Sequence, residues 1–252
     1  MRARSATAAL LILLATPVRA AEPMQTDRPD AAEGPGAVPM HSLQVEAGIT
    51  LANFPDLTIG EILLRYGVAS GVELRVAIPS WSSERTVGNG QLPDGWPRQQ
   101  SSSLTGFGDV GLGGKFELPS PQPRLALGVL GGVTFPTGKS PFGGDRLSTD
   151  LILAAGLELF PIASLAVNVG AVREGATTGF VSAISLGLTH SPRWGSYLEW
   201  AFTNDGSERT QLFDGGLTFL VHPTLQIDLR AGVEGADSPR DLVLGFGLAR
   251  RW

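Results

Sequence analysis

The chain has 252 residues, and 24 aspartates and glutamates against 19 lysines and arginines give it a formal net charge of −5 at pH 7. It contains no cysteine, which excludes disulfides, thiolate metal sites and cysteine nucleophiles. Nucleic-acid binding is disfavoured as well, because it depends on basic patches that contact phosphate.

Residues 1–20 have the three parts of a secretory signal peptide. Arg2 and Arg4 precede the short apolar run AALLILLATP, and VRA follows as a small-residue cleavage signature. The run is too short for a transmembrane anchor, which needs roughly 20 apolar residues. We expect cleavage after Ala20 and export of a mature chain that is still more acidic.

Residues 21–40 form an N-terminal segment that contains the charged motif TDRPD at 26–30. Three charges and a proline in five residues are compatible with a solvated tail. The motif nevertheless lies shortly before the first predicted strand, so its role depends on what the strands build.

Alternation of apolar and polar residues with a period of two dominates the chain from about residue 41 onward. In SLQVEAGITL, for example, Leu43, Val45 and Ile49 share one parity, while Gln44 and Glu46 share the other. Successive strand residues point to opposite faces, so each such segment has one apolar and one polar face. We expect about twelve strands, which begin near residues 42, 57, 72, 104, 124, 149, 165, 180, 196, 211, 224 and 241.

The connections between these strands alternate in character. One set is short, at 69–71, 119–123, 161–164, 192–195 and 222–223. The other set is often longer and more polar, above all the predicted loops 82–103 and 136–148. Outer-membrane barrels have short periplasmic turns and longer extracellular loops. An even strand count would place both chain termini on the short-turn side, in the periplasm.

The alternative fold is a soluble β-sandwich, whose strands also alternate. A sandwich would leave edge strands that need protection, whereas closure into a barrel removes them. In most of the clearer strands the apolar parity also lacks charged residues, as expected of a face that meets lipid. The sequence therefore predicts an all-β fold, a transmembrane antiparallel up-and-down barrel of about twelve strands over residues 41–252.

The last strand, DLVLGFGLARRW, supports the same fold. Its apolar parity carries Leu242, Leu244, Phe246, Leu248 and the final Trp252. An amphipathic last strand that ends in an aromatic residue resembles the C-terminal sorting signal of outer-membrane proteins, so we expect the barrel-assembly machinery and outer-membrane lipids as partners. Arg250 shares this parity at the membrane edge, where a long cationic side chain reaches the headgroups.

Catalytic chemistry finds little support in the sequence. Some outer-membrane barrels are lipid hydrolases with adjacent His and Ser on the lipid-facing surface, but here the histidines are only His41, His190 and His222. His–Ser neighbours along one strand point to opposite faces. The chain has no G-x-S-x-G motif and no zinc-type histidine spacing. We expect no enzyme, no metal and no cofactor.

Charged residues on the polar parity of the first four strands form the candidate pore lining. They are Glu46, Arg65, Glu73, Arg75, Asp109, Lys115 and Glu117. Charges of opposite sign on adjacent strands form cross-strand ion pairs, so these residues either stabilise a narrow polar lumen or select a solute. Later strands add mainly acidic residues, which favours cations or neutral solutes.

Several motifs resemble one family: TDRPD (26–30), VPMHSLQVEAG (38–48), LLRYGV (63–68), VELRV (72–76), GFGDVGLGGKF (106–116) and LALGVLGGVTFPTG (125–138). They resemble the bacterial outer-membrane "transporter" family labelled putative MetA-pathway of phenol degradation. The resemblance covers the first half of the mature chain. It implies a β-barrel in the outer membrane and a part in the uptake of small compounds, aromatic ones included.

Two functions follow as hypotheses. The barrel is either a channel for small solutes or a non-transporting structural or envelope-interaction barrel with a closed lumen. For the N-terminal segment, the alternative to a tail is a plug. In that interpretation Asp27, Arg28 and Asp30 pair with lumen charges such as Arg65, Arg75 or Glu46, and Pro29 fixes the bend.

Overall fold

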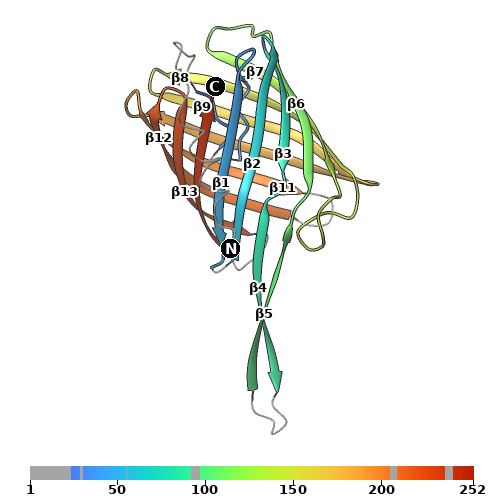
Figure 1. Cartoon of the computed structure of the whole chain (residues 1–252). Coiled ribbons are helices and arrows are strands. Elements are labelled where there is room, and N and C mark those ends of the chain that lie inside the picture. The colour runs from blue at the N-terminus through green and yellow to red at the C-terminus, as the bar shows by residue number, and fades with distance from the viewer. Residues whose placement is uncertain (1–23, 29–30, 55, 92–96, 205–208, 236–240) are drawn as a thin grey trace, which may run out of the picture.

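A computed structural model describes residues 24–28, 31–54, 56–91, 97–204, 209–235 and 241–252. The predicted signal peptide, 1–20, lies outside these residues, as do Pro29, the residue predicted to fix the bend of the plug, and Asp30. The described parts contain fourteen strands (Figure 1): β1 Leu43–Ala52, β2 Asp56–Ala69, β3 Val72–Ile78, β4 Trp81–Gln91, β5 Pro97–Phe107, β6 Val110–Leu118, β7 Leu125–Phe135, β8 Ser148–Phe160, β9 Ala163–Glu174, β10 Thr177–Thr189, β11 Trp194–Asn204, β12 Arg209–His222, β13 Leu225–Gly235 and β14 Asp241–Arg251. Within those same ranges no helix is long and apolar enough to cross a membrane.

Twelve of the fourteen strands close into an antiparallel barrel. Each strand pairs with its neighbour in the chain, except that β3 pairs directly with β6, and β1 pairs with both β2 and β14. At the closing seam, Leu43 and Trp252 exchange two backbone hydrogen bonds of 3.2 and 2.9 Å. The predicted twelve-stranded barrel is confirmed. The strand expected near residue 104 begins at Val110.

The two remaining strands, β4 and β5, correct the prediction that residues 82–103 form a loop. They pair with each other along their whole length, from Trp81 with Phe107 to Gln91 with Pro97. This hairpin pairs with β2 where Leu57–Ile59 meet Trp81–Ser83, the N–H of Arg85 donates to Asp56 at 2.7 Å, and the hairpin projects well beyond the barrel (Figure 1). A ribbon that extends past the barrel wall needs no face for lipid, which explains why its sequence lacks the alternation that identified the other strands.

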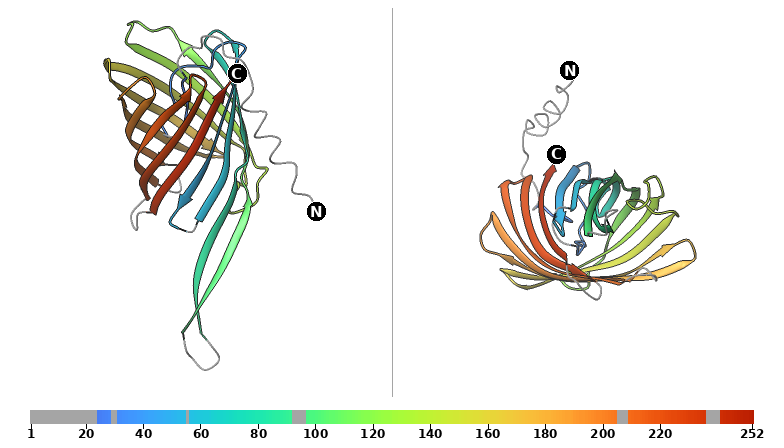
Figure 2. Two further views of the ribbon diagram at one scale, coloured as in Figure 1. Left: turned by 60° about the vertical axis from the view of Figure 1, so that its left-hand side comes forward. Right: turned by 90° about the horizontal axis from the view of Figure 1, so that it is seen from below.

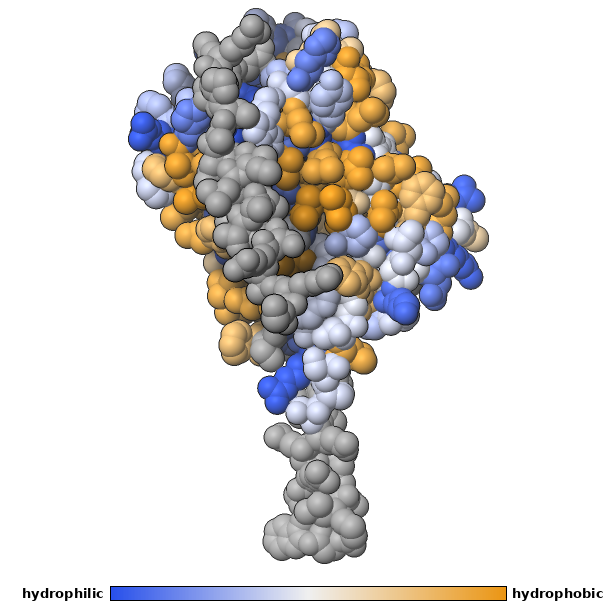
Figure 3. Space-filling model, viewed as in Figure 1, coloured by the Kyte–Doolittle hydropathy of each residue, from blue (hydrophilic) through white to orange (hydrophobic). Residues whose placement is uncertain are grey.

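The two faces of the barrel wall have opposite chemistry. Large apolar side chains point outward and are exposed, such as Leu198 at 66% and Phe246 at 47%, and Figure 3 shows apolar residues gathered over the outer wall. Inward-facing Gln44, Glu46 and Arg65 are fully buried. This is the reverse of a water-soluble domain, in which apolar side chains fill the interior and polar ones face solvent.

The connections divide between the two ends of the barrel. The short turns and the last residue of the chain lie at the end opposite the hairpin (Figures 1 and 2). Gly71, in the turn between β2 and β3, has a φ of 70°, a conformation that glycine adopts without strain. At the hairpin end, β9 and β10 are joined by only two residues, 175–176, so not every connection there is long.

Candidate functional site: a charged segment inside the barrel

The N-terminal segment, which we define as residues 24–40, runs through the barrel interior. The view along the barrel in Figure 2 shows part of it, in blue, inside the ring of strands. The segment has almost no regular secondary structure, so its backbone N–H groups need partners other than a ladder. Side chains of the wall supply them at five places.

These backbone contacts reach across the whole lumen. The N–H groups of Ala31 and Ala32 donate to the two carboxylate oxygens of Glu199 on β11, at 2.6 and 2.7 Å. The N–H of Glu33 donates to Asn168 on β9 at 2.5 Å, and the Asn168 amide donates back to the carbonyl of Glu33 at 2.9 Å. On the opposite side of the barrel, further N–H groups donate to acids of β1, β3 and β6: Asp27 to Glu46 at 3.1 Å, Val38 to Glu73 at 2.7 Å and Ala37 to Glu117 at 2.7 Å.

Asp27 is the centre of a buried charge cluster. One of its carboxylate oxygens lies 3.1 Å from Arg65 Nη1, 3.0 Å from Arg75 Nη2 and 2.9 Å from Lys115 Nζ. Arg65 also pairs with Glu46 at 2.8 Å and with Glu73 at 2.7 Å. Burial alone would raise the pKa of Asp27, but the positive charges of Arg65, Lys115 and Arg75 outweigh burial and hold that pKa well below its usual range.

The wall is electrostatically incomplete without this carboxylate. Arg65 and Arg75 stand directly opposite each other on β2 and β3, where like charges repel. In this cluster three wall cations, Arg65, Arg75 and Lys115, face two wall carboxylates, Glu46 and Glu73. Asp27 lies between the two arginines and balances the charge, which gives the segment a specific place to bind.

Arg28 binds at a second point, in a slot made by two glycines. Gly48 on β1 and Gly247 on β14 stand opposite each other, and a Cβ atom at either one would collide with the guanidinium. Arg28 Nη1 lies 2.8 Å from Glu61 Oε2 on β2. Glu61 has a φ of 40°, its N–H donates to Ser80 Oγ at 3.0 Å, and it accepts a bond from Thr50 at 2.7 Å.

Glu61 is a functional residue that the alternation pattern hides. Leu57 and Ile59 point outward, so a regular strand would point residue 61 outward as well. A bulge at 60–61 shifts the register against β1 and turns Glu61 inward. The sequence does carry a signal, because the apolar parity changes from Leu57 and Ile59 to Leu64 and Tyr66 on either side of Gly60.

Glu33 is the second acid that the segment brings to the cluster. It forms a two-pronged pair with Arg75, at 2.9 and 3.1 Å, and lies 3.7 Å from Lys115 Nζ. Its addition leaves the cluster with one negative charge in excess. Burial and, next, the negative charge of Asp27 raise the pKa of Glu33 to about 7, against the opposing effect of Arg75 and Lys115.

The remaining candidate residues lie elsewhere. Asp109 is not part of the cluster, because its carboxylate accepts the N–H groups of Gly138 and Gly144, both at 2.7 Å, and so holds the 136–147 loop. Glu117 contacts the segment only through Ala37. In the described part of the chain, no group of three or more His, Cys, Asp or Glu residues is placed to hold a metal.

One His–Ser contact joins residues on two sides of a turn, so the pattern along a single strand does not predict it. His190 Nε2 lies 2.7 Å from Ser196 Oγ, across the turn between β10 and β11. A catalytic imidazole is normally oriented by a third group. Among the described residues, Ser196 is the only side chain that hydrogen-bonds His190, so the contact lacks that third group there.

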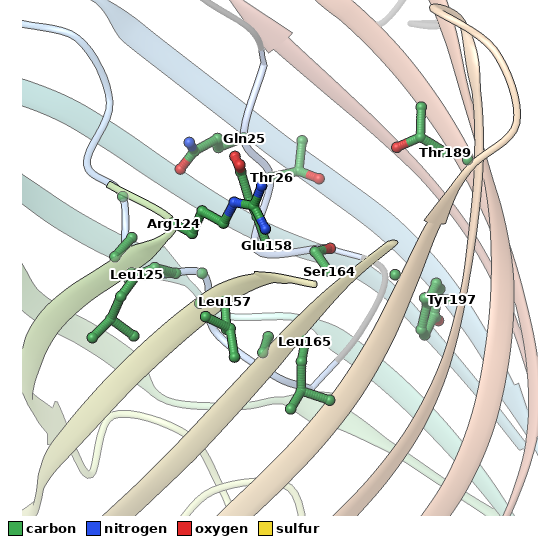
Figure 4. A pocket seen from close by; sticks show the side chains of 18 of the residues that line it. Gln25, Thr26, Arg124, Leu125, Leu157, Glu158, Ser164, Leu165, Thr189 and Tyr197 are labelled. Atoms are coloured by element: carbon green, nitrogen blue, oxygen red, sulfur yellow. The ribbon is translucent and has the colours of Figure 1, made fainter. Parts of the chain in front are cut away.

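Of the cavities that border the described segment, two lie along the same stretch of wall on β6–β8. The large cavity, about 640 Å³, lies toward the short turns, between the segment and the inward residues of β7–β12. Figure 4 shows side chains that line it, from Gln25 and Thr26 on the segment to Arg124, Glu158 and Tyr197 on the wall. The small cavity, about 240 Å³, lies beside Glu33 and Arg75 and is lined by residues of β2, β3 and β6–β8.

The family model described as "Putative MetA-pathway of phenol degradation" matches residues 26–252. The chain belongs to this family. The match begins at Thr26, so it includes the TDRPD motif as well as the whole barrel, and the resemblance seen in the first half of the chain extends through the second. No curated protein matches the sequence.

Solved structures similar to this family member are bacterial channels and porins. An outer membrane channel from Pseudomonas putida F1 has a TM-score of 0.62 and 15% identity, over 86% of this chain and 98% of that one. The KdgM porin has a TM-score of 0.59 and 9% identity, over 82% and 98%. The NanC porin has a TM-score of 0.54 and 8% identity, over 82% and 98%. At such identities the likeness establishes a shared fold.

Proposed function

We propose that this chain is an outer-membrane channel for small solutes, and that residues 24–40 act as a plug inside it. The exposed apolar outer wall supports a membrane location, because a soluble protein rarely exposes so large an apolar surface. The even number of barrel strands and the short turns at the end that carries the last residue support periplasmic termini. The fold shared with outer-membrane channels agrees with both.

The observation that carries the channel function is how the lumen is filled. A barrel of this size can be closed by its own inward side chains. Many inward residues of β7–β10 are small, and part of the space that they leave is occupied by the segment, which belongs to no barrel strand. These small residues are Ala126, Gly128, Ala154, Gly156, Ala166, Ala183 and Gly187. The segment is covalently joined to the wall only at β1 and can therefore move out of the lumen, whereas the side chains of the wall cannot.

The solute follows from the lumen chemistry and from the family. The charges around Asp27 are paired with one another, and the further described lumen charges on β8 and β11–β13 are acidic apart from Arg230: Asp150, Glu158, Glu199, Asp214 and Asp228. We infer a preference for neutral or cationic solutes. The family description suggests small aromatic compounds among them.

The alternative is a structural barrel whose plug never leaves. Its support is the number of ion pairs and backbone bonds that hold the segment. Liposome swelling separates the two functions. Liposomes that carry the full mature chain, or a variant that lacks residues 21–35, are tested with a pentose and with a polar phenol. A channel admits at least one solute after the deletion, whereas a barrel that excludes both solutes in both forms would be structural.

Two further features belong to this proposal. β14, which Trp252 follows, is amphipathic, with Leu242, Leu244 and Phe246 exposed on its outer face, and we infer that the barrel-assembly machinery recognises this strand. Deletion of Trp252 should then lower the amount of assembled barrel in the outer membrane without changing secretion. We also expect no enzymatic activity, since the lumen groups described above are already engaged in ion pairs and backbone bonds.

A further inference from the structure

The two lumen cavities lie along the same part of the wall, separated by one turn of the segment. On β7, inward-facing Ala126 borders the large cavity and Leu130 borders the small one. On β8, Gly156 borders the large cavity and Ile152 borders the small one. Between them, Ala154 is fully buried. The segment therefore crosses β7 and β8 at the level of Ala154. It separates the two cavities, which would otherwise form one continuous path along the wall.

The residues at the crossing are Gly34, Pro35 and Gly36, and the wall is shaped to receive them. A Cβ atom at Gly128 would lie 2.5 Å from the carbonyl oxygen of Pro35, and one at Gly156 would lie 3.1 Å from Pro35 Cγ. Glycine within a strand marks the close approach of another backbone. Gly128 and Gly156 thus form a seat that holds Pro35 against the wall.

The turn is held less tightly than the residues that precede it. Asp27 and Arg28 are fixed by ion pairs of 2.8–3.1 Å. Within the turn, Gly34 donates its N–H to Asp27 at 3.2 Å, and Gly36 accepts a bond from Arg65 at 3.4 Å. Long, off-optimum hydrogen bonds are weaker than short charge-assisted ones. Asp27 and Arg28 can therefore stay bound while the turn moves.

From this geometry, and resting on the proposed channel function, we propose that Pro35 is the gate that sets the size of the solute. The turn at 34–36 lifts from its seat on Gly128 and Gly156, the two cavities join, and the solute passes along β6–β9 while Asp27 and Arg28 remain bound. The small cavity is below the 300 Å³ or so of a typical drug-sized pocket. With Arg75 and Glu33 already paired, the route suits small neutral molecules.

The chain has no cysteine, so a disulfide can lock the gate selectively. A Cβ atom at residue 156 would lie 3.1 Å from Pro35 Cγ, so in a Pro35→Cys/Gly156→Cys variant a small movement of the turn should let a disulfide join the two residues. Liposome swelling with a pentose is measured after oxidation and after reduction. We expect permeability to fall to the level of protein-free liposomes on oxidation and to return on reduction. A second variant, Gly156→Leu, should push Pro35 from its seat and raise permeability.

Matched controls separate the possible failures. Gly187→Leu adds the same side chain to the large cavity, away from Pro35, and should not raise permeability. Deletion of residues 21–35 tests the channel itself. If the deletion opens the barrel but neither oxidation nor Gly156→Leu changes permeability, the gate is elsewhere and the channel function stands. If the deletion fails to open the barrel, the channel function is wrong and the gate falls with it.

Discussion

At the scale of single residues, the account depends on the carboxylate of Asp27. It lies within 3.1 Å of three cations, and two of them, Arg65 and Arg75, stand opposite each other on adjacent strands. Buried charges are stable only when they are paired. The wall therefore favours the bound segment because the segment brings the missing negative charge.

Asp27→Asn removes this charge with little change in shape. Removing one partner of a buried pair costs about 3 kcal/mol or more, so the bound fraction of the segment should fall by roughly a hundredfold relative to the unbound fraction. Single-channel recordings should show more frequent or longer openings. Asp109→Asn is the control, because Asp109 holds the 136–147 loop and not the segment. Equal behaviour of the two variants would contradict the role of Asp27.

Glu33 makes binding of the segment depend on pH. Its pKa is raised to about 7 when bound, by burial and by Asp27, and falls to its ordinary value near 4.5 when released. The bound state therefore holds more protons between these values, so binding strengthens as pH falls through 7 and weakens as pH rises, by up to tenfold per pH unit. The pKa of Asp27 lies below this window, so Asp27 stays charged throughout it.

The measurement compares wild type with Glu33→Gln, which mimics the protonated acid beside Arg75, Lys115 and Asp27. Wild-type conductance should fall between about pH 8 and about pH 5.5. The variant should be more closed than wild type at the higher pH and should lose this part of the response. A pH response that is identical in both proteins would mean that Glu33 does not control binding.

At the scale of elements, alternation predicts the barrel well because each strand must separate lipid from a polar lumen. Glu46, Arg65, Glu73, Arg75 and Lys115 could be assigned to the lumen from their parity alone. Three things escaped the same reasoning. The bulge at 60–61 reverses the inward and outward parity within β2. The β4–β5 hairpin does not alternate apolar and polar residues, and neither does the segment that contains Glu33. Contacts between such a segment and the wall depend on tertiary geometry, which periodicity does not encode.

The hairpin should be dispensable for the fold. The barrel closes through β3 and β6, which pair from Val72 with Phe116 to Ala77 with Gly111, so β4 and β5 add no link to the ring. Replacing residues 86–102 with a two-residue Asn-Gly turn, which keeps Arg85 opposite Ser103, should therefore leave a folded barrel. The check is heat-dependent migration on a detergent gel. A variant that no longer shows the shift would indicate that the hairpin is needed for closure or assembly.

At the scale of the whole molecule, the described lumen charges are mostly acidic away from the segment. Asp150, Glu158, Glu199 and Asp214 line β8, β11 and β12, and the field of a charged pore selects against ions of its own sign. The variant without residues 21–35 should therefore be cation-selective in a salt gradient across a planar bilayer. A reversal potential that indicates clear anion selectivity would contradict the charge assignment of the lumen.

The central claim is that residues 24–40 close a channel that is otherwise open, and the most direct test is conductance. Wild type and the variant lacking residues 21–35 are reconstituted in planar bilayers after both show the heat-dependent gel shift of a folded barrel. The deletion removes Asp27, Arg28, Glu33 and Pro35 together. We predict a clear increase in single-channel conductance. Unchanged conductance in a folded barrel would contradict the account.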